Sequence, residues 1–449
     1  MATLLLIILL IVEFSFLAYG LTRSTSKRAW TPARFVIDAV QIVLFLIMVL
    51  LPGIDFGFRF KMLFSVLVLR LLVAGVYALI YKHNDKIKKK GAMVLSAVIS
   101  VVLISFNMLP AFLFADYHGR PLTGEYEVKE AQTILIDTSR EELFEMDGSC
   151  REVPVHFYYP AECDAEGELP LVIFSHGAFG YYQSNASTYM ELASHGYVVV
   201  SLDHPYHSFF TKDSDGRLIT VDPEFFQTAM YVGGNDNDMS EEEIYEITSE
   251  WMELREADVN FVIDTLEESG LMNASWCTGD VAEAVSLMDT SRIGLMGHSL
   301  GGATAVTVGR RDDISAVIDI DGTMLGEETG VADGMPVIND EPYTTPLLVI
   351  DNEEHHNSGL EALDVGYPYA NNVILEEATE GYRTYIRGAA HMDLTDLPLF
   401  SPFLAGMLNT SESTVGHEEC IDTVNELVLN FFDCYLKGEG GFSVSESYL

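Results

Sequence analysis

The chain has 449 residues and carries 67 acidic against 25 basic side chains, a formal net charge of −42 at pH 7. Residues 1–120 hold 13 of the basic and 5 of the acidic ones, so the rest of the chain holds 12 and 62. A field this negative repels nucleic acid, which excludes nucleic-acid binding from the expected functions. The five cysteines stand at no CxxC spacing, which argues against a zinc or thiol-redox site.

The first 115 residues contain four apolar stretches, at about 2–21, 35–51, 62–81 and 92–115. Each is close to the ~20 residues that a helix needs to cross a bilayer. We therefore predict a first domain, residues 1–115, that is all α-helical and crosses the membrane about four times. Glu13 and Arg70 fall within the first and third stretches, where a charge needs a partner. They either pair with each other or each face a neighbouring helix.

Basic residues gather in the first and third connections between these stretches. They are Arg23, Lys27, Arg28 and Arg34 in the first connection, and Lys82, Lys86, Lys88, Lys89 and Lys90 in the third. Short loops rich in Lys and Arg stay on the cytoplasmic side of a membrane. The sequence therefore predicts a multi-pass plasma-membrane protein in which everything after residue 116 is extracytoplasmic.

From residue 116 to residue 449 the pattern alternates between strands and helices, which predicts a second domain. The expected strands are 132–137, 153–159, 171–175, 197–203, 293–296, 316–320, 347–351 and 383–386. The expected helices are 184–194, 241–268, one from residue 301, and 417–437. Alternation of this kind is typical of a mostly parallel sheet with helices on both faces.

The long helix expected over 241–268 carries an apolar stripe at helical spacing. Its members are Ile244, Ile247, Trp251, Leu254, Phe261 and Thr265. A stripe of this kind normally faces the core of a domain. We therefore expect these side chains to pack against the sheet.

Two segments without regular periodicity precede that helix. The first, Phe174-Ser175-His176-Gly177-Ala178-Phe179-Gly180, follows the strand at 171–175, and we expect His176 to hold this turn by hydrogen bonds. The second, 204–240, is irregular, and long loops are often functional. Its aromatic and proline residues either line an apolar entrance or pack the loop down. They are Pro205, Tyr206, Phe209, Phe210, Phe225, Phe226 and Tyr231.

The segment Gly297-His298-Ser299-Leu300-Gly301 follows an expected strand and opens an expected helix. It matches G-x-S-x-G, the nucleophile turn of α/β-hydrolases, in which a strained serine projects above the end of the sheet. Ser299 is therefore the expected nucleophile. In this fold one oxyanion donor is the N–H of the residue after the serine, and the other comes from the turn after an earlier strand. Those donors are Leu300 and Ala178.

A nucleophilic serine needs a histidine base and an acid, which follow it along the chain in this fold. Of His355, His356, His391 and His417, we assign the base to His391, which lies in the loop just past the strand at 383–386, where it can reach the serine. We expect His355 and His356 in an exposed loop and His417 on the surface. The acid is open between Asp319, Asp321 and Asp351, of which Asp321 and Asp351 end expected strands.

Four segments together resemble the plasma-type (isoform II) platelet-activating factor acetylhydrolases. They are 174–180, 297–304, 318–324 and 386–393. The resemblance implies Asp321 as the acid, Ala178 as an oxyanion donor and short-acyl phospholipids as substrates. Leu300 stands where the mammalian enzymes typically have Phe.

We therefore expect a serine hydrolase that cleaves lipid esters through an acyl-enzyme, with Ser299, His391 and Asp321 as its triad. This chemistry requires no metal or organic cofactor. The alternatives are a general carboxylesterase or acyltransferase acting on another cell-surface substrate and, more remotely, a non-catalytic membrane binding protein.

Overall fold

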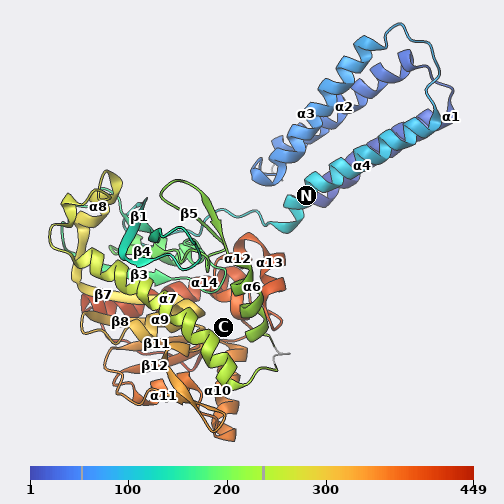
Figure 1. The fold of residues 1–449 in the computed structure, drawn as a ribbon. Helices are drawn as coiled ribbons and strands as arrows, with labels where there is room; N and C mark the ends of the chain where they lie inside the picture. The colour runs from blue at the N-terminus through green and yellow to red at the C-terminus, as the bar shows by residue number, and fades with distance from the viewer. Residues whose placement is uncertain (52–53, 235–237) are drawn as a thin grey trace. The chain divides into compact units, whose positions relative to one another are not determined.

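The computed structural model describes residues 1–51, 54–234 and 238–449. The chain divides into two compact units (Figure 1). One comprises Met1–His118 and Phe400–Leu404, and the other Gly119–Leu399 and Ala405–Leu449. Residues 235–237, which belong to the segment expected to be irregular, lie outside the described residues.

The first unit is built from four helices, α1 (Ala2–Thr22), α2 (Lys27–Leu50), α3 (Phe58–Ile80) and α4 (Lys90–Leu113). They have 21 to 24 residues each and are long and apolar enough to cross a membrane. Helix α2 begins earlier than the apolar pattern suggests, because Ser26 caps it by accepting a hydrogen bond from the Ala29 N–H. Lys27, Arg28 and Arg34, which we assigned to the connection before this helix, therefore lie inside it.

Four charged side chains meet inside this helix bundle. Glu13 pairs with Arg70, which was one of our two alternatives for these residues. Glu13 also pairs with Arg34 at 2.7 Å. Asp38 lies 2.9 Å from both guanidinium groups. Two cations and two anions cancel, so the cluster as a whole is neutral, which lowers its cost in an apolar environment.

The second unit contains a nine-stranded sheet whose strand order is β1-β2-β4-β3-β7-β8-β11-β12-β13 (Figure 1). The strands are β1 (Val128–Glu141), β2 (Cys150–Pro160), β3 (Leu169–Ser175), β4 (Val198–Leu202), β7 (Met288–His298), β8 (Ile314–Ile320), β11 (Leu347–Asn352), β12 (Gly381–Ile386) and β13 (Ser447–Tyr448). β2 pairs antiparallel with β1 and β4, and the pairs from β4 to β13 are parallel. The parallel order crosses over at β3, so the ends of β3, β7 and β8 lie side by side.

Helices cover both faces of this sheet. Apolar side chains of α7 (Glu241–Glu267), α8 (Asp280–Leu287), α9 (Leu300–Val308) and α11 (Ala370–Glu377) share one core cluster with the strands. On the other face, α5 (Ala186–Ser194) places Tyr189 against Phe174, with ring centroids 4.8 Å apart. There α14 (His417–Phe432) places Phe432 against Tyr197. A short π-helical turn, Asp433–Lys437, ends the helix expected over 417–437.

The stripe predicted for the long helix is wrong by about one residue. The residues of α7 that are buried are Thr248, Met252, Arg255, Asp258, Val259, Val262, Ile263 and Leu266. Three of these are polar, so a reading based on hydrophobicity passes over them and selects their half-exposed neighbours. The true inner face of α7 therefore carries two charged residues, Arg255 and Asp258.

The segment 204–240 is more ordered than we expected. It contains a hairpin of β5 (Phe210–Lys212) and β6 (Leu218–Thr220), followed by helix α6 (Pro223–Val232). Asp222 caps α6 by accepting hydrogen bonds from two backbone N–H groups. Its aromatic residues follow neither expectation as a group. Phe225 is buried and packs the segment down, whereas Phe209 and Phe226 remain exposed.

Candidate active site

Ser299 stands at the sharp turn between β7 and α9. Its φ is 57° and its ψ −126°, a conformation that costs a non-glycine residue energy and is held only by its surroundings. The glycines on either side explain how the turn closes. A Cβ at Gly297 would overlap the carbonyl of Gly301, and one at Gly301 would overlap the carbonyl of Ser175. The structure therefore gives Ser299 the strained strand-to-helix position that the motif predicted.

Asp321 follows β8 directly and has φ 58°. The Ser299 N–H donates to the carbonyl of Ile320 at 2.9 Å, so the strand ends that carry Ser299 and Asp321 are hydrogen-bonded. The buried carboxylate accepts hydrogen bonds from the backbone and the side chain of Asn352, at 2.7 and 2.5 Å. Burial raises the pKa of Asp321, but hydrogen bonds from His355 and His391 outweigh it and hold the pKa far below its ordinary value.

His391 lies in the short 3-10 helix η3 (His391–Leu394) after β12, with its side chain 29% exposed. Its Nδ1 is 2.6 Å from Asp321 Oδ2. Its backbone carbonyl lies 3.2 Å from His298 Nε2, and the two rings are 4.5 Å apart, which puts His391 beside the residue that precedes Ser299. Since Asp321 occupies Nδ1, Nε2 is the nitrogen left for proton transfer. Within the described residues no hydrogen bond joins Ser299 to His391, and such bonds often tighten only when substrate binds.

The other two candidate acids have different partners. Asp351 accepts a hydrogen bond from Arg383 Nε at 2.6 Å. Asp319 is fully buried beside the glycine turn and accepts from the Gly322 N–H. Burial and the nearby Asp351 raise the pKa of Asp319 well above its ordinary value. Of the three, the structure brings Asp321 to His391.

The expectation that His355 and His356 lie in an exposed loop is wrong. They belong to the first turn of helix α10 (Glu353–Val365), which Asn352 caps by accepting from the His355 N–H. His355 Nδ1 lies 3.1 Å from Asp321, so two histidines share one carboxylate. Burial lowers the pKa of His355, but its hydrogen bond to Asp321 together with the negative charges of Asp321, Asp351 and Asp319 outweighs this and raises the pKa to about 9. The cap Asn352 and the acidic first turn were visible signals of this helix.

Asp321, Asp351 and His355 also present atoms within 4.8 Å of one another, a spacing that suits metal ligands. Both oxygens of Asp321 already accept hydrogen bonds from nitrogen donors. A cation there would have to displace His355 or His391 from the carboxylate. The donor set therefore fits a hydrogen-bonded cluster better than a metal centre.

The turn after β3 lies against the serine. A Cβ at Gly177 would stand 3.0 Å from the Cβ of Ser299. Within the part of the chain that the structure describes, the N–H groups of Ala178 and Leu300 donate no hydrogen bond, so both are free for a ligand. Ala178 and Leu300 also join one apolar cluster with Phe225 of α6. The two expected oxyanion donors thus flank Ser299 beside an apolar wall.

A buried polar network behind this turn escaped the sequence analysis. His176, as expected, holds the turn, with Nε2 2.8 Å from Ser208 Oγ. Ser175 Oγ lies 2.9 Å from His204 Nε2, and His204 Nδ1 lies 2.9 Å from Asp258. This second Ser-His-Asp set is at most 2% exposed, so no substrate reaches it. The only sequence signal was the pair Arg255 and Asp258, spaced by three on a buried helix face.

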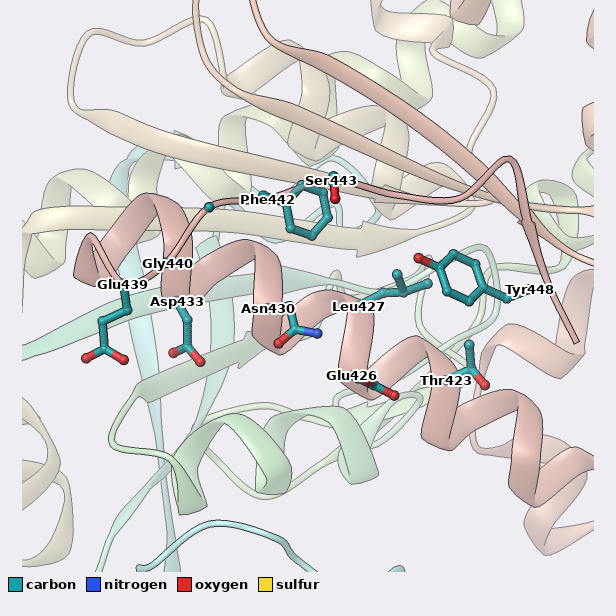
Figure 2. A pocket seen from close by; sticks show the side chains of 11 residues that line it. Thr423, Glu426, Leu427, Asn430, Asp433, Glu439, Gly440, Phe442, Ser443 and Tyr448 are labelled. Carbon is teal, nitrogen blue, oxygen red and sulfur yellow. The ribbon is translucent and has the colours of Figure 1, made fainter.

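The cavity shown in Figure 2 does not belong to this site. It measures about 480 Å³ and lies between α14 and the segment leading to β13, where Phe442 and Tyr448 face the helix. Its lining is mostly polar and acidic, with Glu426, Asp433 and Glu439 among its residues. None of its lining residues is Ser299, His391 or Asp321, so this cavity lies apart from the candidate site.

The sheet order, the crossover at β3 and a strained serine between β7 and α9 define the α/β-hydrolase fold, preceded by an all-α unit of four apolar helices. A ferulic acid esterase from Streptomyces cinnamoneus has the same fold, with a TM-score of 0.52 and 20% identity, over 73% of this chain and 95% of that one. Residues 140–446 match the family platelet-activating factor acetylhydrolase, isoform II. The chain belongs to that family.

Named relatives are distant. The chain is 21% identical to the platelet-activating factor acetylhydrolase of Canis lupus familiaris over 60% of its own length and 57% of that protein. It is 22% identical to that of Gallus gallus over 62% and 65%. A probable 1-alkyl-2-acetylglycerophosphocholine esterase of Arthroderma benhamiae is 24% identical over 40% and 37%. The chain therefore spans less than two thirds of the relatives that it matches.

Proposed function

We propose that this chain is a membrane-anchored serine esterase that cleaves carboxylic esters of lipids. The observation that carries the proposal is the strained turn of Ser299, hydrogen-bonded through its N–H to the strand end that carries Asp321, whose carboxylate lies 2.6 Å from His391 Nδ1. Membership of a family named for acetylhydrolases supports the same chemistry.

In the proposed reaction His391 Nε2 takes the proton of Ser299 as Oγ attacks the acyl carbonyl. Asp321 orients His391 and stabilises its charged form. The negative charge that develops on the carbonyl oxygen binds to the N–H groups of Ala178 and Leu300, with the N-terminus of α9 beneath it. Proton return releases the alcohol, and water then hydrolyses the acyl-enzyme by the same steps.

We propose esters with one short or polar acyl chain as substrates. The names of the relatives support this choice. The apolar cluster of Leu300, Phe225 and Phe179 beside the oxyanion donors supplies a hydrophobic wall for them. The negative charge of residues 121–449 favours zwitterionic or neutral lipids over anionic ones.

The four apolar helices are proposed to cross the plasma membrane and to keep the second unit on its outer side. The lysines at 82–89 lie between α3 and α4 and Lys90 begins α4, and the positive-inside rule places that connection in the cytoplasm. A tag at the C-terminus should then be cleaved by protease added to intact cells. A protected C-terminal tag would place the second unit in the cytoplasm.

Replacement of Ser299 by Ala tests the mechanism. We expect the full chain in detergent to lose both labelling by a fluorophosphonate and hydrolysis of p-nitrophenyl acetate. Ser291→Ala is the matched control, because Ser291 lies exposed on the same strand. Full labelling of Ser299→Ala would refute the assignment.

A second assay tests the substrate. It compares kcat/KM for acetyl and long-chain acyl forms of one phospholipid, with and without an acceptor alcohol. We expect the acetyl form to be preferred and the acid to be the main product. Equal rates across chain lengths would leave a general esterase, and transfer to the alcohol as the main reaction would make the protein an acyltransferase.

A further inference from the structure

Arg255 is the most unusual charged residue near the site, because it is fully buried and bonds to no carboxylate. Its neighbour one turn along α7, Asp258, pairs instead with Arg151 at 2.7 Å and with His204 at 2.9 Å. Within the described residues, Arg255 forms no ion pair shorter than 4.0 Å, while its side chain is 0% exposed. The charge of Asp258 acts on the guanidinium, but no carboxylate of the described residues is hydrogen-bonded to it. Burial of such a charge is costly, so its position calls for a reason.

The partners of Arg255 are two backbone carbonyls of the turn beside Ser299. Nη1 donates to the carbonyl of His176 at 2.6 Å, and Nη2 donates to that of Gly177 at 3.3 Å. The carbonyl of Gly177 and the N–H of Ala178 belong to the same peptide group. The arginine therefore contacts the oxygen end of the Gly177–Ala178 peptide dipole. In the proposed function, the N–H end of the same dipole points at the oxyanion.

We propose that Arg255 is a positioning residue of the oxyanion hole, which fixes and polarises the peptide group between Gly177 and Ala178. This inference rests on the proposed function. A hydrogen bond to a peptide oxygen draws electron density from its N–H and makes that N–H a stronger donor. Because Arg255 makes both hydrogen bonds within the folded protein, the effect is present before substrate arrives and acts on the charge that develops in the transition state.

The neighbouring groups support this assignment over a purely structural one. His176 Nδ1 lies 2.6 Å from the same Gly177 oxygen, so the turn is already held at that atom without Arg255. His176 Nε2 and Ser208 hold it at a second point. The guanidinium adds a full positive charge to a turn that neutral groups already hold in place.

The experiment measures the full chain in detergent with Arg255→Met, Arg255→Lys and Arg310→Met. Arg310 is the control, a mostly buried arginine paired with Glu327 at 2.8 Å that has no contact with residues 176–178 among the described residues. Rates are divided by the concentration of serine that a fluorophosphonate titrates, so that loss of folded protein does not count. Loss of one oxyanion donor costs about 10²- to 10³-fold in kcat. Because Arg255→Met weakens a donor without removing it, we expect kcat to fall about 10- to 100-fold with little change in KM.

Two further readouts separate polarisation from folding. A trifluoromethyl ketone, which forms a tetrahedral oxyanion on the serine, should bind Arg255→Met more weakly by the same factor as kcat/KM falls. Arg255→Lys keeps the charge but not the two-pronged geometry, so its kcat should lie between those of the wild type and Arg255→Met. Arg310→Met should keep the wild-type kcat per titrated serine.

Wild-type kcat per serine in Arg255→Met would overturn the proposal. If Arg255→Met does not fold, wild-type kcat in Arg255→Lys with unchanged ketone binding overturns it, and a fall in both supports it. If the wild-type chain itself takes no fluorophosphonate, the proposed function fails and this inference fails with it. If the wild-type chain is labelled by the fluorophosphonate but the Arg255 variants keep the wild-type kcat per titrated serine, this inference alone is refuted.

Discussion

Replacement of Asp321 by Asn is the sharpest test of the proposed triad. Oδ2 of Asp321 accepts from His391 Nδ1 and from Asn352 Nδ2, while Oδ1 accepts from Asn352 N and from His355 Nδ1. An amide at this position places its NH₂ group against two donors whichever way it turns. Facing His391, it forces the imidazole into the tautomer that carries its proton on Nε2, and that nitrogen can no longer accept the proton of Ser299.

The size of the effect follows from this geometry. The same change in a serine-protease triad lowers kcat by about 10⁴, which is about 5 kcal/mol of barrier. We expect Asp321→Asn to lower kcat by about 10³- to 10⁴-fold with KM nearly unchanged. Asp351→Asn is the matched control: it weakens the pair with Arg383 and lowers the Tm, but it leaves the carboxylate of His391 in place.

The assay follows p-nitrophenyl acetate hydrolysis by the full chain in detergent, with rates divided by the concentration of folded protein. Thermal unfolding is measured separately for each variant. A larger loss of kcat in Asp351→Asn than in Asp321→Asn would place the acid after β11 and refute the reasoning.

Three further predictions concern packing and charge. Gly301→Ala should abolish activity and lower the free energy of unfolding by about 3 kcal/mol or more, because the added Cβ would overlap a carbonyl of β3. Gly330→Ala is the control, because its added Cβ would meet open space. Equal thermal stability of the two variants would contradict this prediction. The raised pKa of His355, about 9, implies stabilisation that is complete below about pH 6.5 and is lost as the pH rises through 9. The gap in urea-unfolding free energy between wild type and His355→Gln should therefore shrink by up to about 3 kcal/mol from pH 6 to 10, and a constant gap would count against it. Arg70→Met should lower the thermal midpoint in detergent, and adding Glu13→Gln should restore part of it because neutrality returns; a further fall in the double variant would show that the ions do not act as a unit.

Local steric rules explain why the nucleophile turn could be predicted from sequence. Ser299 needs small residues two positions to either side, and that requirement is written in five consecutive letters. The alternating strands and helices of the second unit and the four apolar helices of the first follow from equally local patterns. The family membership predicted from four short segments is confirmed by the match over residues 140–446.

Pairings between distant residues explain most of what the sequence could not give. The contact of His355 with Asp321 depends on where helix α10 begins relative to β8, which no local pattern states. The inner face of α7 was misjudged because Arg255 and Asp258 are buried by partners more than fifty residues away. A hydrophobicity scale ranks such residues as exposed, and only their hydrogen-bond partners lower the free-energy cost of burying them.

The second Ser-His-Asp set also bears on how such proteins evolve and are designed. Ser175, His204 and Asp258 repeat the residue types and hydrogen bonds of the proposed triad, yet all three are buried, and the histidine braces a turn. What separates the two sets is access and backbone strain, because Ser299 and Asp321 have a positive φ and Ser299 and His391 are partly exposed, whereas Ser175, His204 and Asp258 are buried and have no positive φ. Grafting the three side chains onto another scaffold would therefore reproduce the brace rather than the catalyst unless the strained turn were grafted with them.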